Sequence, residues 1–144
     1  MHPFPHLYSV RSQSTPAGVV TLTMPGLAPL ESAAPKEFDG PGDRWSPEGF
    51  LTAAVADCFI LSFRAIAAAS KFEWTQLEAS TEGRLDRLEG KMRFTQFTTR
   101  ATLKVPPGTD LDRARRLLER AEQSCLIANS LCAERHLEAS VEVT

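Results

Sequence analysis

The sequence predicts an α+β fold with mostly antiparallel sheets and one long buried helix at its centre. Eight of the ten prolines lie at or before Pro47, which predicts strands and turns in residues 1–46. Residues 50–69 are apolar on almost every side, as in a buried helix. Residues 72–105 carry β-type residues that partly alternate. The expected order is β-β-α-β-β-α-α-β, and 144 residues suit a single domain over residues 1–144.

The N-terminal region is expected to begin with a β-hairpin. Residues 7–13 and 17–24 are rich in β-branched residues, and Ser14, Thr15 and Pro16 between them favour a turn. Residues 25–45 are expected to form a loop with room for one short strand.

The central helix has a start signal at three consecutive positions. Ser46 suits the N-cap, Pro47 suits the first helical position, and the charge of Glu48 suits the positive end of the helix dipole. Asp57 and Arg64 are the only charged residues of the apolar part. They are about two turns apart, so they share a face and need partners or water.

The next region is expected to be a long antiparallel hairpin. Its strands cover residues 72–85 and 92–105, on either side of a turn at Glu89 and Gly90. Phe94 and Phe97 cannot share one face of a regular strand, so a bulge is expected near Thr95 or Gln96.

The C-terminal region combines helix and strand patterns. Thr109 is a candidate cap for an amphipathic helix, whose apolar positions are Leu111, Ala114, Leu117, Leu118 and Ala121. A second helical piece is expected over residues 126–135. Residues 136–143 alternate strictly between apolar and polar, which predicts a strand with one buried face.

Composition excludes several functional classes. The chain is 42% hydrophobic and 24% charged with a net charge of -2, which is typical of a soluble globular protein and argues against nucleic-acid binding by basic attraction. The chain has no uninterrupted apolar stretch long enough to span a membrane, so a membrane protein is not expected. The first residues lack a signal-peptide pattern, so a cytoplasmic location with reduced cysteines is expected.

The three cysteines are the most informative candidates for chemistry. Cys58 lies within the apolar helix, Cys125 at the expected junction of two helices, and Cys132 seven residues later. Backbone N–H groups at a helix start would favour the Cys125 thiolate. Free cysteines more often pack than react, so packing stays the alternative for each. The three histidines show no metal-ligand spacing with them, so no metal site is expected.

Two motifs together resemble the OsmC/Ohr family of osmotically inducible and organic-hydroperoxide-resistance proteins. Pro47 and Glu48 open an apolar helix that carries Cys58, and Cys125 follows beyond a long hairpin with a short apolar run after it. The similarity spans residues 42–143. It implies an OsmC-like fold, an intertwined homodimer with sites at the interface, and no cofactor.

The resemblance also implies a peroxidase that reduces organic hydroperoxides or hydrogen peroxide with a thiol or dithiol reductant. Cys58 would be oxidised to a sulfenic acid, and Cys125 would resolve it as a disulfide. Glu48 and an arginine from the N-terminal hairpin would support the thiolate. Arg11 is carried over as that arginine, although it falls in the first expected strand and not in the turn after it; Arg44 is the alternative.

Helix geometry constrains the role of Glu48. Ten residues of straight helix span about 15 Å, so Glu48 and Cys58 of one chain would not touch. If both serve one site, the glutamate comes from a second subunit; otherwise it only complements the helix dipole. A departure from the family pattern is Leu126, where proline usually follows the second cysteine. The alternative function is a non-catalytic binder of small or acyl ligands, with the cysteines as packing residues.

Overall fold

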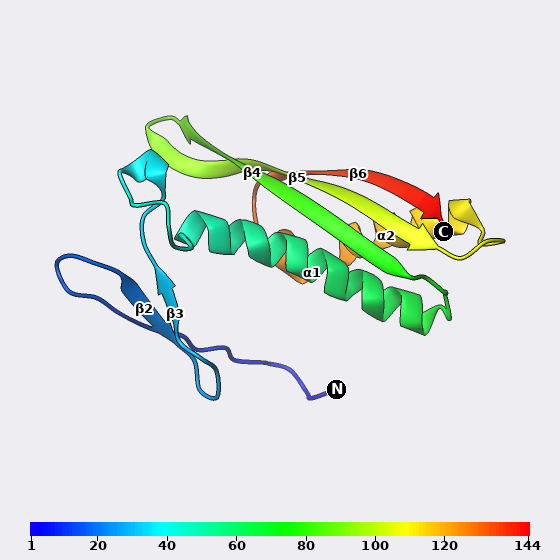
Figure 1. Ribbon diagram of the computed structural model, residues 1–144, viewed down its shortest axis with the longest axis horizontal. Helices are drawn as coiled ribbons and strands as arrows, with labels where there is room; N and C mark the ends of the chain where they lie inside the picture. The colour runs from blue at the N-terminus through cyan, green and yellow to red at the C-terminus, as the bar shows by residue number, and fades with distance from the viewer. The chain divides into compact units, whose positions relative to one another are not determined.

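The computed structural model describes residues 1–144 and divides the chain into two compact units, Met1–Phe50 and Leu51–Thr144 (Figure 1). Each unit contains one three-stranded sheet. The boundary lies close to Ser46, where the sequence changes character. That the whole chain behaves as a single domain stays a prediction.

The first unit contains the expected N-terminal hairpin. β1 (Arg11–Gln13) pairs antiparallel with β2 (Val20–Thr23), which pairs antiparallel with β3 (Leu30–Ser32). The hairpin is confirmed, although its strands are shorter than predicted. β3 is the short strand that was considered possible within residues 25–45. A single turn of 3-10 helix, η1 (Lys36–Phe38), follows.

The predicted start of the long helix α1 (Pro47–Ala69) is confirmed. The Gly49 backbone N–H donates to Ser46 Oγ at 3.1 Å, so Ser46 caps the helix as expected. By length and composition alone, α1 is long and apolar enough to cross a membrane. The core helices of soluble proteins share these two properties, so they are weak evidence for a membrane span.

The buried part of α1 is a single stripe. Val55, Phe59, Phe63 and Ala67 recur every four residues and are buried. Leu61, on the opposite side, is 50% exposed, and Asp57 and Arg64 are exposed as well. The expectation of burial on almost every side is therefore not met within one chain, because the chain covers only the stripe that faces its own sheet.

The second sheet has the order β4-β5-β6. β4 (Gln76–Leu88) and β5 (Lys91–Val105) form the predicted antiparallel hairpin, turning at Glu89 and Gly90 with positive φ angles of 50° and 78°. Arg84 pairs with Gln96 while Leu85 pairs with Phe94, which leaves Thr95 as the extra residue. This confirms the predicted bulge, and the Phe94 and Phe97 rings stack at 5.0 Å.

Two helices connect β5 to β6 (Glu134–Val143), which runs parallel to β5. α2 (Leu111–Ser124) is capped by the Asp110 side chain, which accepts from the Arg113 N–H at 3.0 Å. Thr109 was the wrong cap, because its hydroxyl donates to the Pro106 carbonyl at 2.7 Å.

The second helical piece is shorter than predicted. α3 covers only Leu126–Asn129, and β6 begins at Glu134, so Arg135 lies in a strand and not in a helix. The reason is that β6 pairs in parallel with β5 from Glu134 onwards, where Glu134 is opposite Gln96. The strand therefore begins two residues before the alternating apolar pattern that predicted it.

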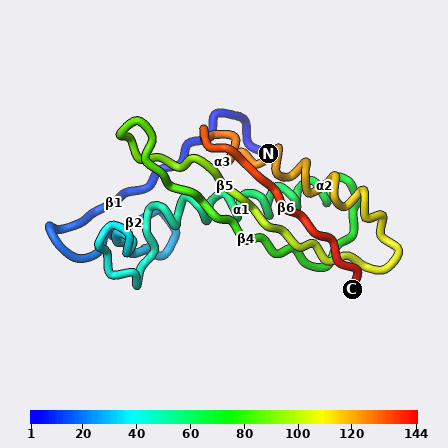
Figure 2. Tube along the Cα trace, turned by 90° about the horizontal axis from the view of Figure 1, so that it is seen from above, coloured from blue at the N-terminus to red at the C-terminus, as the bar shows by residue number.

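The helices α1 and α2 cover one face of the β4-β5-β6 sheet (Figure 1), and the three strands run side by side above them (Figure 2). The main core lies between these layers, and its fully buried members are Phe63, Ala67, Leu103, Val105, Ala114, Leu118 and Ala121. The other sheet face is polar and carries the exposed Arg100–Glu138 ion pair at 2.9 Å. Any chemistry that needs shielding from water in this unit therefore belongs between helices and sheet.

Candidate functional site at the cysteine pair

Cys58 lies on α1 at the edge of the stripe that packs against the sheet. It is next to the buried Phe59 and one turn after Val55, and its own side chain is half-buried. Its Sγ lies 3.9 Å from the Ser62 hydroxyl, one turn further along the helix. Cys58 is thus attached to a rigid element while its thiol keeps some access to solvent.

Cys125 lies at the junction between α2 and α3, as predicted. It closes α2 and opens α3 in an extended conformation, with φ -65° and ψ 102°. Its N–H donates to the Glu122 carbonyl at 3.3 Å, and its carbonyl accepts from the Asn129 N–H at 2.9 Å. The side chain is only 2% exposed. The helix break therefore forms with Leu126 where the family usually has proline.

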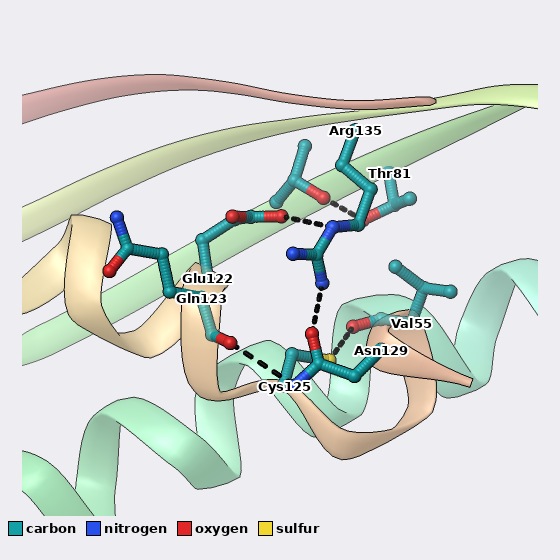
Figure 3. Close-up of polar contacts among 8 residues, drawn as sticks. Val55, Thr81, Glu122, Gln123, Cys125, Asn129 and Arg135 are labelled. Atoms are coloured by element: carbon teal, nitrogen blue, oxygen red, sulfur yellow. Dashed lines mark hydrogen bonds and ion pairs between the residues drawn. The ribbon is translucent and has the colours of Figure 1, made fainter. Parts of the chain in front are cut away.

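The fold brings the two thiols together although they are 67 positions apart in the sequence. Cys125 Sγ points toward the Val55 carbonyl of α1 at 4.0 Å (Figure 3). Both cysteines pack in a second buried cluster with Val55 and Phe97. They are free thiols in this structure. A disulfide between α1 and the α2–α3 junction requires that the two cysteines be neighbours in the fold, as they are in this cluster.

Burial controls the ionisation of Cys125. Loss of solvent raises the pKa of its thiol from 9.0 to about 11. The N–H of Ala128 acts in the opposite direction, the neighbouring Cys58 thiol raises the pKa further, and the N–H of Ile127 lowers it. The expectation that the helix start favours the thiolate is therefore wrong: the N–H groups are present, but desolvation outweighs them. At neutral pH Cys125 is a protonated thiol.

The main chain on both sides of Cys125 is tied to β6 by polar side chains (Figure 3). Arg135 Nε lies 3.2 Å from Glu122 Oε1, and Arg135 Nη1 donates to Asn129 Oδ1 at 2.7 Å. Asn129 Nδ2 in turn donates to the Gln123 carbonyl at 3.1 Å. We call Arg135, Glu122 and Asn129 the Arg135 clamp.

The Arg135 clamp was not predicted from the sequence, although one signal of it was present there. Glu122 lies in the last turn of α2, which contains no basic residue. A carboxylate there opposes the helix dipole by about 0.3–1 kcal/mol. A carboxylate in this unfavourable position is expected to have a positively charged partner, and Arg135 is that partner.

Little space remains beside the buried thiol. The cavity lined by Cys125, Phe97, Thr99 and Arg135 measures about 10 Å³, room for one water molecule at most. The site is therefore closed around Cys125.

The family model described as OsmC-like protein matches residues 40–140. The chain belongs to the OsmC-like family. The family resemblance that the two motifs indicated is therefore confirmed.

Individual relatives support the same assignment. The chain is 31% identical to the uncharacterised protein YmaD of Bacillus subtilis over 114 residues, 76% of each chain. It superposes on an OsmC-like protein of unknown function from Vibrio cholerae with a TM-score of 0.85, at 20% identity over 94% of this chain and 100% of that one. For an organic hydroperoxide resistance protein OsmC from Legionella pneumophila the TM-score is 0.76, at 23% identity over 97% and 99%. The predicted OsmC-like α+β fold is confirmed.

The other predicted residues of this OsmC-like chain belong to its N-terminal unit. Arg11 is exposed in β1, opposite Thr23. Arg44 is ion-paired with Glu31 at 3.1 Å and with Asp43 at 3.2 Å. Glu48 is partly buried in the first turn of α1. Their catalytic roles stay predictions.

Two further features of the OsmC-like chain bear on its chemistry. Cys132 is exposed, in the segment between α3 and β6. No group of three or more His, Cys, Asp or Glu side chains is arranged to hold a metal ion.

Proposed function

We propose that this protein is a thiol-dependent peroxidase that reduces organic hydroperoxides or hydrogen peroxide through Cys58 and Cys125. The observation that carries the proposal is the packing of these two free thiols against each other between α1 and the α2–α3 junction. Membership of the OsmC-like family supports it, as does the fold shared with organic hydroperoxide resistance proteins.

The different exposure of the two thiols assigns their roles. Cys58 is half-buried and accessible, whereas Cys125 is buried and protonated at neutral pH. Cys58 is therefore the residue that meets the peroxide. Its sulfur bonds to one peroxide oxygen as the O–O bond breaks, which leaves a sulfenic acid on Cys58 and, after protonation, an alcohol or water.

Cys125 then completes the turnover. Its sulfur displaces the hydroxyl of the Cys58 sulfenic acid, so that an S–S bond forms, the S–O bond breaks and water leaves with the Cys125 proton. The disulfide is reduced by an external thiol or dithiol, which is itself oxidised. No cofactor takes part in this cycle.

The binding-protein alternative finds little support in the space beside Cys125. A small organic ligand needs a cavity of a few hundred Å³, and the space beside Cys125 is about 10 Å³. Phe59 and Phe63, which belong to the stripe of α1 that packs against the sheet, are fully buried in the core.

Peroxide consumption tests the proposal. With dithiothreitol as reductant, the wild type should consume tert-butyl hydroperoxide, and Cys58→Ser should lower the rate by about a hundredfold or more, because the nucleophile is lost. Cys125→Ser should still be oxidised once, then lose turnover or become overoxidised. The control is Cys132→Ser, which removes the exposed thiol and should retain the wild-type rate. Equal rates for wild type and Cys58→Ser would refute the peroxidase.

The same assay decides which arginine supports the thiolate. Arg11→Met should lower the rate of peroxide consumption, because the positive charge that the family resemblance assigns to the support of the nucleophile is lost. Arg44→Met, which loses only exposed ion pairs, should behave as wild type. The reverse pattern would transfer the role to Arg44.

A further inference from the structure

The Arg135–Glu122 ion pair is well shielded from solvent. The two side chains are 27% and 20% exposed, whereas the ion pairs of Arg44, Arg84, Arg100, Arg115 and His136 have both members at least 40% exposed. Exposed pairs contribute little, but a shielded pair with further hydrogen bonds holds its geometry firmly. The pair is therefore suited to fixing a position.

The position that it fixes is that of Cys125. Glu122 precedes this cysteine by three residues and Asn129 follows it by four, so Arg135 reaches the chain on both sides of the thiol (Figure 3). The backbone bonds Cys125 N–H to Glu122 and Asn129 N–H to Cys125 close the same short loop.

The strand that carries Arg135 is part of the same packing. Arg135 is opposite Phe97 in the β5–β6 register, and Phe97 packs in the cluster that contains both cysteines. The Arg135 clamp thus links the sheet, the helix junction and the thiol in one unit of contacts. α3 itself has only four residues, one short turn, so the position of the junction depends on contacts beyond α3.

We propose that the Arg135 clamp is a positioning device that sets the rate at which Cys125 resolves the Cys58 sulfenic acid. The inference rests on the proposed peroxidase function. Arg135 does not touch peroxide or sulfenic acid; it acts through the placement of Cys125. Resolution needs the two sulfur atoms aligned along the S–O bond, and a displacement of about 1 Å from such a geometry costs on the order of a hundredfold in rate.

The clamp predicts that the two chemical steps respond differently to its loss. Oxidation of Cys58 by peroxide does not use Cys125, so Arg135→Met should leave that rate within about twofold of wild type. Disulfide formation should slow by about tenfold or more, and the Cys58 sulfenic acid should persist. A role limited to stability would not separate the steps.

The experiment is a single turnover of the reduced full-length chain with one equivalent of tert-butyl hydroperoxide. Samples are quenched with dimedone, which traps sulfenic acid, and the trapped and disulfide forms are counted by intact mass. The variants are Arg135→Met and Asn129→Ala. Arg135→Lys should recover part of the rate, because it keeps a cation for Glu122 without the fork that reaches Asn129.

The matched control is Arg100→Met, which removes the exposed ion pair with Glu138 on the polar face of the same sheet. It should resolve at the wild-type rate. Circular dichroism verifies that each variant is folded; if Arg135→Met does not fold, Asn129→Ala decides. Wild-type resolution rates in the folded clamp variants would overturn the proposal.

A second arm separates this proposal from the peroxidase itself. Diamide oxidises a dithiol to a disulfide without any peroxide, so it reports directly on how readily Cys125 reaches Cys58. Slower disulfide formation with diamide in the clamp variants supports the clamp even if peroxide does not react. Rapid wild-type reaction with peroxide, together with equal diamide rates in all variants, would refute the clamp and leave the peroxidase intact.

Discussion

The two cysteines of the site are the same residue type with different physical properties. Cys58 is half-buried on a rigid helix, whereas Cys125 is 2% exposed at a helix break and holds its proton up to about pH 11. In the proposed mechanism, burial and not residue identity therefore distinguishes the thiol that reacts with the peroxide from the thiol that resolves the sulfenic acid.

The ionisation of Cys125 predicts a pH dependence of stability. Its pKa is raised from 9.0 to about 11 in the folded state, so the folded chain holds the proton more tightly than the unfolded chain. The stabilisation is complete below pH 9 and is lost as the pH rises through about 11. It amounts to about 2–3 kcal/mol at most.

Urea unfolding of the reduced protein between about pH 8 and pH 11 measures this effect. Wild type and Cys132→Ser should lose stability along the same curve. Cys125→Ala should lose less over this range, because the group that titrates is gone. Identical pH slopes for wild type and Cys125→Ala would contradict the assignment.

At the level of elements, the site depends on the close approach of β4 to α1. A Cβ atom on Gly83 would lie 2.8 Å from ring carbons of both Phe94 and Phe97, and 3.0 Å from Thr52 Oγ1. The bulge at Thr95 is what places both rings on this face. Phe97 also packs in the cluster that contains Cys125, so a displacement of the Phe97 ring would also disturb the site.

Gly83→Ala should therefore destabilise the protein by about 1–3 kcal/mol, because the two stacked rings must move to admit a methyl group. The matched control is Ser80→Ala, at an exposed position of the same strand, which should change stability by less than about 0.5 kcal/mol. Chemical denaturation measures both. Equal stability of wild type and Gly83→Ala would show that the rings yield freely.

Local patterns were sufficient to predict most elements but not their partners. The cap at Ser46, the long hairpin and the bulge each follow from a few neighbouring residues. The parallel pairing of β6 and the early end of α3 depend on contacts between distant segments, which a local pattern does not contain.

The same distinction applies to the site. The two cysteine motifs identified Cys58 and Cys125, and the fold brings these residues together. Arg135 could not be linked to Cys125 from the sequence, because Arg135 was expected in a helix. In the structure it lies in β6, and its partners Glu122 and Asn129 lie in the helices that pack on the sheet. The raised pKa of Cys125 was missed because a helix start is visible in a sequence, whereas the degree of burial is not.

At the level of the whole molecule, the face of α1 opposite the buried stripe is exposed, and it carries Leu61 between the charged residues Asp57 and Arg64. Leu61 lies two residues from both Phe59 and Phe63, about 200° around the helix, and is 50% exposed. We propose that a second copy of the chain covers this face, as the family resemblance implied. That arrangement also offers a way for Glu48 of one chain to serve Cys58 of another.

Leu61→Glu should therefore convert a dimer into monomers. Each Leu61 side chain is 50% exposed, so covering two of them is worth about 1.5–3 kcal/mol, and losing it weakens the association by about ten- to a hundredfold before the cost of burying the new charges. Analytical ultracentrifugation gives the mass, and peroxidase activity should fall with it. The control Leu27→Glu places the same charge at an exposed leucine in the turn between β2 and β3 and should remain dimeric. A monomeric wild type would refute the proposed assembly.

The central claim is that peroxide joins Cys58 to Cys125, and non-reducing peptide mass spectrometry tests it most directly. After one equivalent of peroxide, the reduced protein should lose about two mass units, with Cys58 and Cys125 in one cross-linked peptide pair and Cys132 still free. Two unreacted thiols in the folded protein, or a disulfide that links Cys132 instead, would contradict the account.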